Sequence, residues 1–179
     1  MNSEKIEAGM KLILQGLDCD LRDPNFEDTP ARYAKSLRQI FGGSQEKTWN
    51  DFQETYSDLI LLRNHVVHTL CPHHMLPVRM EVCIAYIPNG RVIGLSKLAR
   101  VMHEINRAPL LQEAFTYQVL DLLLNLTGAQ SGACLVQGEH GCMRIRGVKT
   151  DGDVITSSFK GEFLEPLRQQ QFFQLIGRR

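Results

Sequence analysis

The sequence has no net charge, because 20 Lys and Arg residues balance 20 Asp and Glu residues over 179 residues. Without an excess of one sign, no field draws the whole protein to nucleic acid or to an acidic membrane surface, and we expect neither partner. The sequence also lacks an apolar run as long as a membrane span, and residues 1–5 lack the pattern of a signal peptide. These absences predict a cytoplasmic protein.

Cysteine is scarce, and the five cysteines form an odd set without an export signal. That usage predicts thiols in a reducing compartment and argues against a disulfide framework. Cys19, Cys83 and Cys134 have unremarkable neighbours and are predicted to be core or surface thiols. Cys71 and Cys142 differ, because histidines lie close to both in the sequence.

The length and composition predict one globular domain spanning residues 1–179, since 43% of residues are hydrophobic and 22% are charged. We expect an N-terminal helical part over residues 1–56 and a core over residues 57–179. The first helix has apolar residues at helical spacing from Ile6 to Leu17. A second helix begins at Asp28-Thr29-Pro30, with Thr29 as its cap, and ends at Gly42-Gly43. Residues 44–56 are predicted to form an irregular arm.

The core is predicted to be α+β, with an antiparallel sheet and the order β-β-α-α-β-β. Two β-rich strands come first, then two consecutive helices, then two further strands and a closing helix. The predicted strands comprise residues 59–70, 78–87, 132–137 and 154–159. After a turn at 138–141, the third strand is predicted to continue over 143–148. The predicted helices comprise residues 95–106, 109–128 and 165–176.

The stretch Cys71-Pro72-His73-His74 places a thiolate and two imidazoles within four residues. Cys71 and His74 can reach one metal ion from a single turn, and His140-Gly141-Cys142 is the best source of a third ligand. Two Cys and one His leave the fourth tetrahedral position of a zinc ion open, which is the catalytic arrangement. The plainer interpretation is a free cysteine beside surface histidines at a strand end.

Two basic clusters suit a polyphosphate. Ser96, Lys97 and Arg100 open a helix, where unpaired backbone amides attract anions. Arg144 and Arg146 alternate along a predicted strand and would point to one side, close to Cys142, unless they form only an exposed basic edge.

Four further residues are candidates for proton transfer or substrate binding. His73 and His140 neighbour proposed ligands without being needed as ligands, and an imidazole pKa near 6.5 suits proton transfer. Gln112 and Glu113 open the second core helix. A glutamate there can simply complement the helix dipole, but a carboxylate also suits a guanine edge. His65, His68 and His103 are expected to be structural.

Taken together, these motifs resemble the GTP cyclohydrolase I family. The resemblance rests on Cys-x-His-His, Tyr-Ile-Pro, Gly-Leu-Ser-Lys-Leu-Ala-Arg, Gln-Glu, His-x-Cys-Met and Arg-Gly-Val, in that order, and on Asp-Thr-Pro-Ala-Arg at the second helix. It covers residues 6–175. One departure is Pro72, where the family usually has glutamate.

The resemblance implies a tunnelling fold, whose subunits form pentameric rings that usually pair as a decamer, with active sites at subunit interfaces. It implies that GTP and water become formate and 7,8-dihydroneopterin triphosphate, the first step of pterin and tetrahydrofolate biosynthesis. Zinc would be bound by Cys71, His74 and Cys142. Proton transfer would involve His73, His140 and Ser96. Guanine would bind to Gln112 and Glu113. The residues that contact the triphosphate or the ribose would be Ser96, Lys97, Arg100, Arg146 and Arg32. Arg32 and Glu113 are candidates to serve a neighbour's zinc.

Two alternatives stay open from the sequence alone. One is a family paralogue that acts on another purine nucleotide or feeds a deazapurine pathway. The other is a non-catalytic, zinc-stabilised ring that binds nucleotides or a protein partner.

Overall fold

The computed structural model describes residues 1–43, 49, 51–53 and 58–177. It divides into two compact units, Met1–Gly42 and Gly43–Arg179, each of which is described by itself. The single domain expected from the sequence stays a prediction. The irregular arm expected over residues 44–56 lies mostly outside the described residues; its described part includes a short strand, β1 (Asp51–Gln53).

The first unit consists of two packed helices, α1 (Ser3–Gly16) and α2 (Thr29–Phe41), as the apolar spacing predicts. The side chain of Asn2 caps α1 by accepting from the Lys5 amide at 2.9 Å. The predicted cap at Thr29 is wrong. Thr29 is the first helical residue, and its hydroxyl donates backwards to the Asn25 carbonyl at 3.3 Å instead of accepting from the helix.

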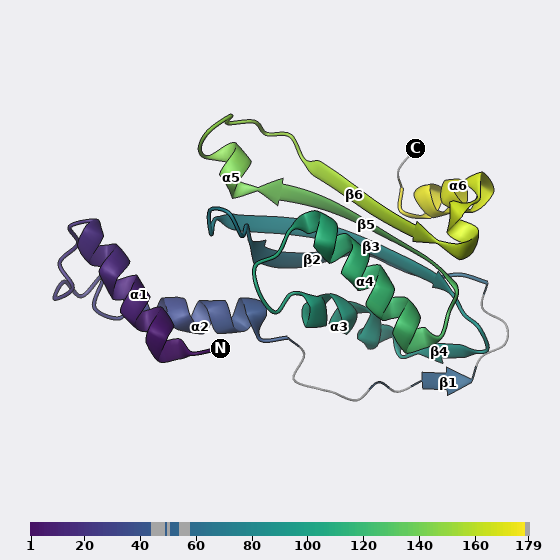
Figure 1. The fold of residues 1–179 in the computed structure, drawn as a ribbon, viewed down its shortest axis with the longest axis horizontal. Helices are drawn as coiled ribbons and strands as arrows, with labels where there is room; N and C mark the ends of the chain where they lie inside the picture. The colour runs from purple at the N-terminus through teal and green to yellow at the C-terminus, as the bar shows by residue number, and fades with distance from the viewer. Residues whose placement is uncertain (44–48, 50, 54–57, 178–179) are drawn as a thin grey trace. The chain divides into compact units, whose positions relative to one another are not determined.

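The second unit is built on a four-stranded antiparallel sheet with the order β2-β3-β5-β6 (Figure 1). Between the second and third of these strands the chain forms two helices, so the predicted order β-β-α-α-β-β and the α+β class are confirmed. The elements are β2 (Ile60–Leu70), β3 (Pro77–Ile87), α3 (Leu95–Ile105), α4 (Gln112–Thr127), β5 (Ser131–His140) and β6 (Val154–Lys160). A short strand, β4 (Arg91–Ile93), pairs with β1 in a separate two-stranded sheet.

Both faces of the sheet are covered, and the alternation along β3 shows how. Val82, Ile84 and Tyr86 are buried in the core shared with α3 and α4. Cys83 and Ala85 point the other way and pack in a second core with Phe163 and Phe172, from the 3-10 turn η1 (Gly161–Leu164) and from α6 (Pro166–Leu175). A strand buried on both faces needs a continuous apolar run, which is what the β3 sequence supplies.

The segment after β5 differs from the prediction. β5 continues to His140, because Val78 of β3 pairs with that residue, so no turn forms at 138–141. The strand predicted at 143–148 is wrong: a short helix, α5 (Gly141–Arg144), follows β5 directly. Gly147 and Lys149 have positive φ values of 60° and 51°, which a strand does not accommodate. α4 also begins later than predicted, at Gln112 rather than at Pro109.

No helix among the described residues has both the length and the apolar character that crossing a membrane would require.

Candidate metal centre and active-site cavity

The loop that joins β2 to β3 presents Cys71, His73 and His74. Two backbone hydrogen bonds close it, from the Cys71 amide to the Leu76 carbonyl at 2.9 Å and from the Met75 amide to the Cys71 carbonyl at 2.8 Å. Met75 takes a positive φ of 54° to complete the reversal. As a result Cys71 is buried, while both histidine side chains are exposed.

The fold brings the three predicted metal ligands together. Potential ligand atoms of Cys71, His74 and Cys142 all lie within 4.8 Å of one another. The ring nitrogen of His74 that faces the Cys71 sulfur is Nδ1, at 3.9 Å. Cys142 reaches the group from α5, because the pairing of β3 with β5 carries the end of β5 to the start of β3.

The donor set fits zinc. Burial, and then the neighbouring Cys71 thiol, raise the pKa of the Cys142 thiol above its usual range. Two thiols held this close resist ionising together unless a cation joins them, and a divalent metal removes that penalty. Two sulfurs and one imidazole nitrogen are ligands that zinc prefers, and they leave one tetrahedral position open.

A cavity of about 190 Å³ lies beside this group. It brings together the two predicted proton carriers, His73 and His140, and the predicted guanine-binding pair, Gln112 and Glu113. Its lining also includes Thr69, Cys71, Pro72, Val78, Met80, Leu110, Leu111, Cys142, Met143 and Val154. Sites for whole drug-sized ligands usually measure about 300–1,000 Å³. A single chain therefore encloses room for only part of a nucleotide.

His140 and Gln112 form a direct contact inside the cavity, with His140 Nε2 2.7 Å from Gln112 Oε1. The Gln112 side chain is only 4% exposed although it carries a polar amide. Its Nε2 lies 2.9 Å from the Val154 carbonyl and 3.2 Å from the Val136 carbonyl. Burial lowers the pKa of His140, and the charge of Glu113 partly opposes that effect. Gln112 thus lines the cavity together with Glu113, but its side-chain amide forms hydrogen bonds with other residues of the same chain.

Glu113 lies in the first turn of α4 and is exposed. It lines the cavity and also a neighbouring hollow of about 270 Å³ that Thr116, Tyr117 and residues 156–158 complete. The carboxylate therefore shares a cavity with the metal ligands of its own chain. Because the Glu113 side chain is exposed, it can accept hydrogen bonds from a ligand that enters from solvent.

Sequence reasoning did not single out Thr69. Its side chain is 4% exposed, it lines the cavity, and its hydroxyl has no hydrogen-bond partner among the described residues. Its only sequence signal is the alternation along β2, which places Thr69 on the same face as Val67 and Cys71.

The two arginines after Cys142 do not share a strand face, contrary to the prediction. Arg144 turns back to Glu139 at 3.0 Å and to Asp153 at 2.9 Å. Arg146 is exposed, and its Nη1 lies 2.6 Å from Nε2 of His74. Only Arg146 is therefore brought beside the metal group.

The predicted phosphate-binding residues Ser96, Lys97 and Arg100 do not line the cavity of their own chain. α3 begins just after Ile93, whose backbone amide donates a hydrogen bond to the Tyr86 hydroxyl oxygen at 3.3 Å. Tyr86 lies near the end of β3 that is opposite the metal loop, and the 11 residues of β3 span roughly 35 Å. The start of α3 and the metal group thus lie at opposite ends of the sheet.

The remaining predicted residue, Arg32, lies on α2 in the first unit and pairs with Asp28 at 3.0 Å. At the start of α3, Lys97 is buried, with only 5% of its surface exposed, whereas its neighbour Ser96 is exposed.

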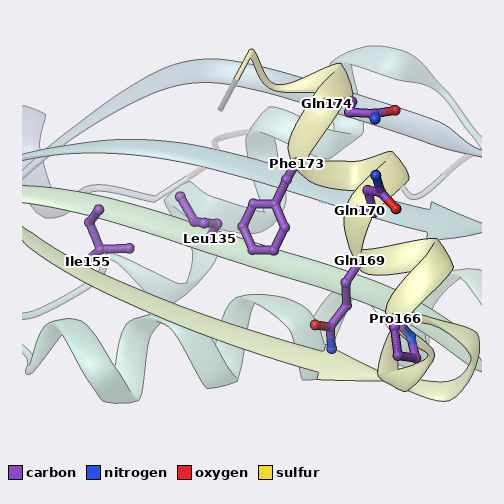
Figure 2. Close-up of a pocket in the computed structure, with 7 residues that line it drawn as sticks. All are labelled: Leu135, Ile155, Pro166, Gln169, Gln170, Phe173 and Gln174. Atoms are coloured by element: carbon purple, nitrogen blue, oxygen red, sulfur yellow. The ribbon is translucent and has the colours of Figure 1, made fainter. Parts of the chain in front are cut away.

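A larger hollow, of about 750 Å³, lies between α6 and the other face of the sheet (Figure 2). Its lining consists of apolar side chains and glutamine amides, namely Leu135, Ile155, Pro166, Gln169, Gln170, Phe173 and Gln174. None of these seven residues can titrate near neutral pH or bind zinc strongly, so the smaller cavity is the candidate for chemistry.

Sequence comparison finds a family model and relatives that match nearly the whole chain. The sequence model of the GTP cyclohydrolase I family matches residues 6–177. The GTP cyclohydrolase 1 of Clostridium perfringens (strain 13 / Type A) is 39% identical over 170 residues, which are 92% of each chain. That of Streptococcus pneumoniae (strain ATCC BAA-255 / R6) is 34% identical over 183 residues, covering 99% of this chain and all of the relative.

Among solved structures, an archaeosine synthase QueF-Like in the apo form aligns with 58% of this chain and 96% of its own, at 18% identity and a TM-score of 0.47. The match to the family model over nearly the whole length and the two full-length relatives are the findings that decide membership. The chain belongs to the GTP cyclohydrolase I family.

Proposed function

We propose that this enzyme holds one zinc ion per chain and converts GTP and water to formate and 7,8-dihydroneopterin triphosphate. The observation that carries the proposal is the cluster of Cys71, His74 and Cys142, because its two cysteines line a cavity that His73 and His140 also line. When zinc is bound there, it supplies a hydrolytic nucleophile at neutral pH, because it lowers the pKa of coordinated water.

His73 and His140 are the groups proposed to move protons. His73 lies next to the metal group, with its Nδ1 3.9 Å from the Cys71 sulfur, and it is exposed to an entering substrate. His140 lines the cavity from the end of β5. Opening the imidazole ring of a purine, releasing formate and closing a new ring each require proton transfers, which two imidazoles that line one cavity can serve.

Glu113 is proposed to select guanine. A carboxylate accepts from both N1–H and the 2-amino group of guanine, whereas adenine offers a lone pair at N1 and no 2-amino group. Adenine would therefore leave the carboxylate without partners, which costs about 2–5 kcal/mol when the pair is buried, or roughly 30-fold to several thousand-fold in discrimination.

The triphosphate is proposed to meet Arg146 of the same chain and Ser96, Lys97, Arg100 and Arg32 of a neighbouring one. This division is supported by the small volume of the cavity and by the distance between the start of α3 and the metal group. It requires an oligomer, and we propose the pentameric ring, paired as a decamer, that the family resemblance implies. The cytoplasmic location and the place in tetrahydrofolate biosynthesis stay predictions.

The decisive experiment incubates zinc-loaded protein with GTP or with ATP and follows formate and the fluorescence of the oxidised pterin. We expect both products from GTP and little turnover of ATP. Glu113→Gln should lower GTP turnover sharply and leave the zinc content unchanged, because Glu113 is not among the grouped ligands. Equal turnover of ATP and GTP would overturn the guanine assignment, and tight GTP binding without formate release would favour a non-catalytic ring.

A further inference from the structure

The contacts of Gln112 fix which of its terminal atoms is which. The carbonyl oxygens of Val136 and Val154 can only accept hydrogen bonds, and both lie within 3.2 Å of Gln112 Nε2. The amide nitrogen must therefore point at them, between β5 and β6. The amide oxygen is left facing His140 Nε2 at 2.7 Å. An inverted amide would place oxygen against two carbonyl oxygens, which is unfavourable.

This orientation also fixes the proton on His140. Gln112 Oε1 only accepts, so His140 Nε2 must donate and must carry a hydrogen. In the neutral ring the other nitrogen, Nδ1, is then bare. Nδ1 is thus the ring atom that is left to take a proton from a ligand in the cavity, and Nε2 is committed to the protein.

Two threonines extend the same chain of hydrogen bonds in one direction. The Thr116 hydroxyl donates to the backbone carbonyl oxygen of Gln112 at 2.8 Å. Having one hydrogen, it must accept from the Thr156 hydroxyl, 2.6 Å away. The Thr156 hydroxyl oxygen, 3.1 Å from Gln112 Nε2, shares the two hydrogens of that nitrogen with the two valine carbonyls. Every donor in this network has an assigned acceptor, so the Gln112 side chain has one stable orientation.

Gly138 supplies the space for the contact. A Cβ at this position would lie 2.0 Å from Gln112 Oε1 and 3.0 Å from His140 Nε2. A side chain there would displace the amide oxygen from the ring. Gly138 has no positive φ, so the steric requirement at Gln112 is the reason for glycine that the structure supplies.

We propose that Gln112 is a positioning residue for His140, holding the ring with Nε2 protonated and Nδ1 open to the cavity, and is not a guanine contact. The inference rests on the proposed function for its kinetic test. Two residues that are adjacent in sequence then have different roles: Glu113 contacts the ligand, and the Gln112 side chain contacts the protein. It also gives Thr156 and Gly138 roles in catalysis although neither touches the metal group.

The kinetic test uses variants that disrupt the contact between Gln112 and His140 in different ways. Gln112→Met removes the amide and keeps the length of the side chain. Gly138→Ala displaces the amide without changing it, and Thr156→Val removes one acceptor while its matched control, Thr156→Ser, keeps the hydroxyl. Gly152→Ala is the control for an added methyl group, since a Cβ there meets nothing closer than 3.4 Å.

Loss of the outer hydrogen-bond partner of a metal-ligating histidine typically costs 10-fold to 100-fold in metal affinity or activity, and we expect a comparable fall of kcat, about 10-fold to 100-fold, in Gln112→Met and Gly138→Ala. KM for GTP should change less than about threefold, since ground-state binding is untouched. In a His140→Ala background, Gln112→Met should cost less than about twofold more, because it acts through His140. A raised KM with kcat unchanged, or a full additional loss in the His140→Ala background, would overturn the proposal.

A second readout does not depend on turnover. Solid-state NMR of zinc-loaded protein with 15N-labelled histidine rings, assigned by loss of the signal in His140→Ala, reports which nitrogen of His140 carries the proton. We expect a protonated Nε2 and a bare Nδ1 at neutral pH, and a mixed pattern in Gly138→Ala. A protonated Nδ1 in the wild type would contradict the proposed role of Gln112 even if GTP is hydrolysed. A wild type that shows the expected pattern but leaves GTP intact would instead contradict the proposed function.

Discussion

Arg146 and the predicted zinc ligand His74 share a hydrogen bond that metal binding through Nδ1 would break. A guanidinium only donates, so the 2.6 Å contact requires a bare Nε2 on His74. The neutral ring then carries its proton on Nδ1, the nitrogen that faces the Cys71 sulfur. A histidine that binds a metal through Nδ1 carries its proton on Nε2 and cannot accept from Arg146. Metal binding would thus free Arg146 for an anionic ligand.

Arg146→Ala should therefore strengthen zinc binding. The lost contact is one hydrogen bond, worth about 0.5–1.5 kcal/mol, so we expect roughly twofold to tenfold tighter zinc binding in competition with a chromophoric chelator. KM for GTP should rise at the same time, because a phosphate contact is gone. Arg22→Ala, which removes an exposed arginine paired with Asp20, is the charge control. Weaker zinc binding in Arg146→Ala would show that the arginine supports the ligand set.

Cys142→Ala should lose both metal and turnover. Cys142 lies on α5, outside the sheet, so far-UV circular dichroism should keep the signal of the wild type while zinc content falls from about one per chain to near zero. Cys19→Ser, a change to a thiol in the first unit, is the control and should retain zinc. A folded Cys142→Ala protein with stoichiometric zinc would mean that another residue is the third ligand.

Mixed oligomers should reveal sites built from two chains. Lys97→Ala damages the start of α3, and His140→Ala damages the cavity at the opposite end of the sheet. Each homogeneous oligomer should be nearly inactive, but co-refolded equal mixtures should recover about a quarter of wild-type activity, the share of interfaces with two intact halves.

The same experiment has a built-in control. Glu113 and His73 line one cavity of a single chain, so a mixture of Glu113→Ala and His73→Ala should recover far less activity. Recovery in that mixture, or none in the first, would contradict the proposed division of the site.

Stability should fall in mild acid partly through His65. Burial lowers the pKa of His65 below its usual 6.5, and the nearby His103 adds to the effect. As the pH falls through about 6.5, the unfolded chain takes up this proton before the folded chain does, so the free energy of unfolding decreases. In thermal unfolding followed from about pH 7.5 to about pH 5.5, His65→Gln should lose less stability than the wild type.

His68→Gln, on the same strand and exposed, is the matched control for replacing a β2 histidine by glutamine. Parallel curves for the wild type and His65→Gln would show that His65 does not contribute to the acid sensitivity.

Much of this protein could be predicted from its sequence because the relevant forces are local. Helical spacing of apolar residues locates α1 and α2, and the two-residue alternation together with continuous apolar runs locates β2 and β3. Cys71 and His74 are three residues apart, so a single turn is enough to place them together. The motifs that indicate the family are likewise short and contiguous, which is why they could be recognised without knowing the fold.

Tertiary structure decided what depends on strand register and on distance along the sheet. The pairing of Val78 with His140 extends β5, excludes the predicted turn and carries Cys142 to Cys71. Gln112 sits beside Glu113 in sequence, yet contacts with carbonyls of two strands turn its amide into the protein. Ser96 and Lys97 lie at the far end of the sheet because β3 must be crossed in full before α3 begins. No local pattern encodes these relationships, since they arise only when segments tens of residues apart pair in one register.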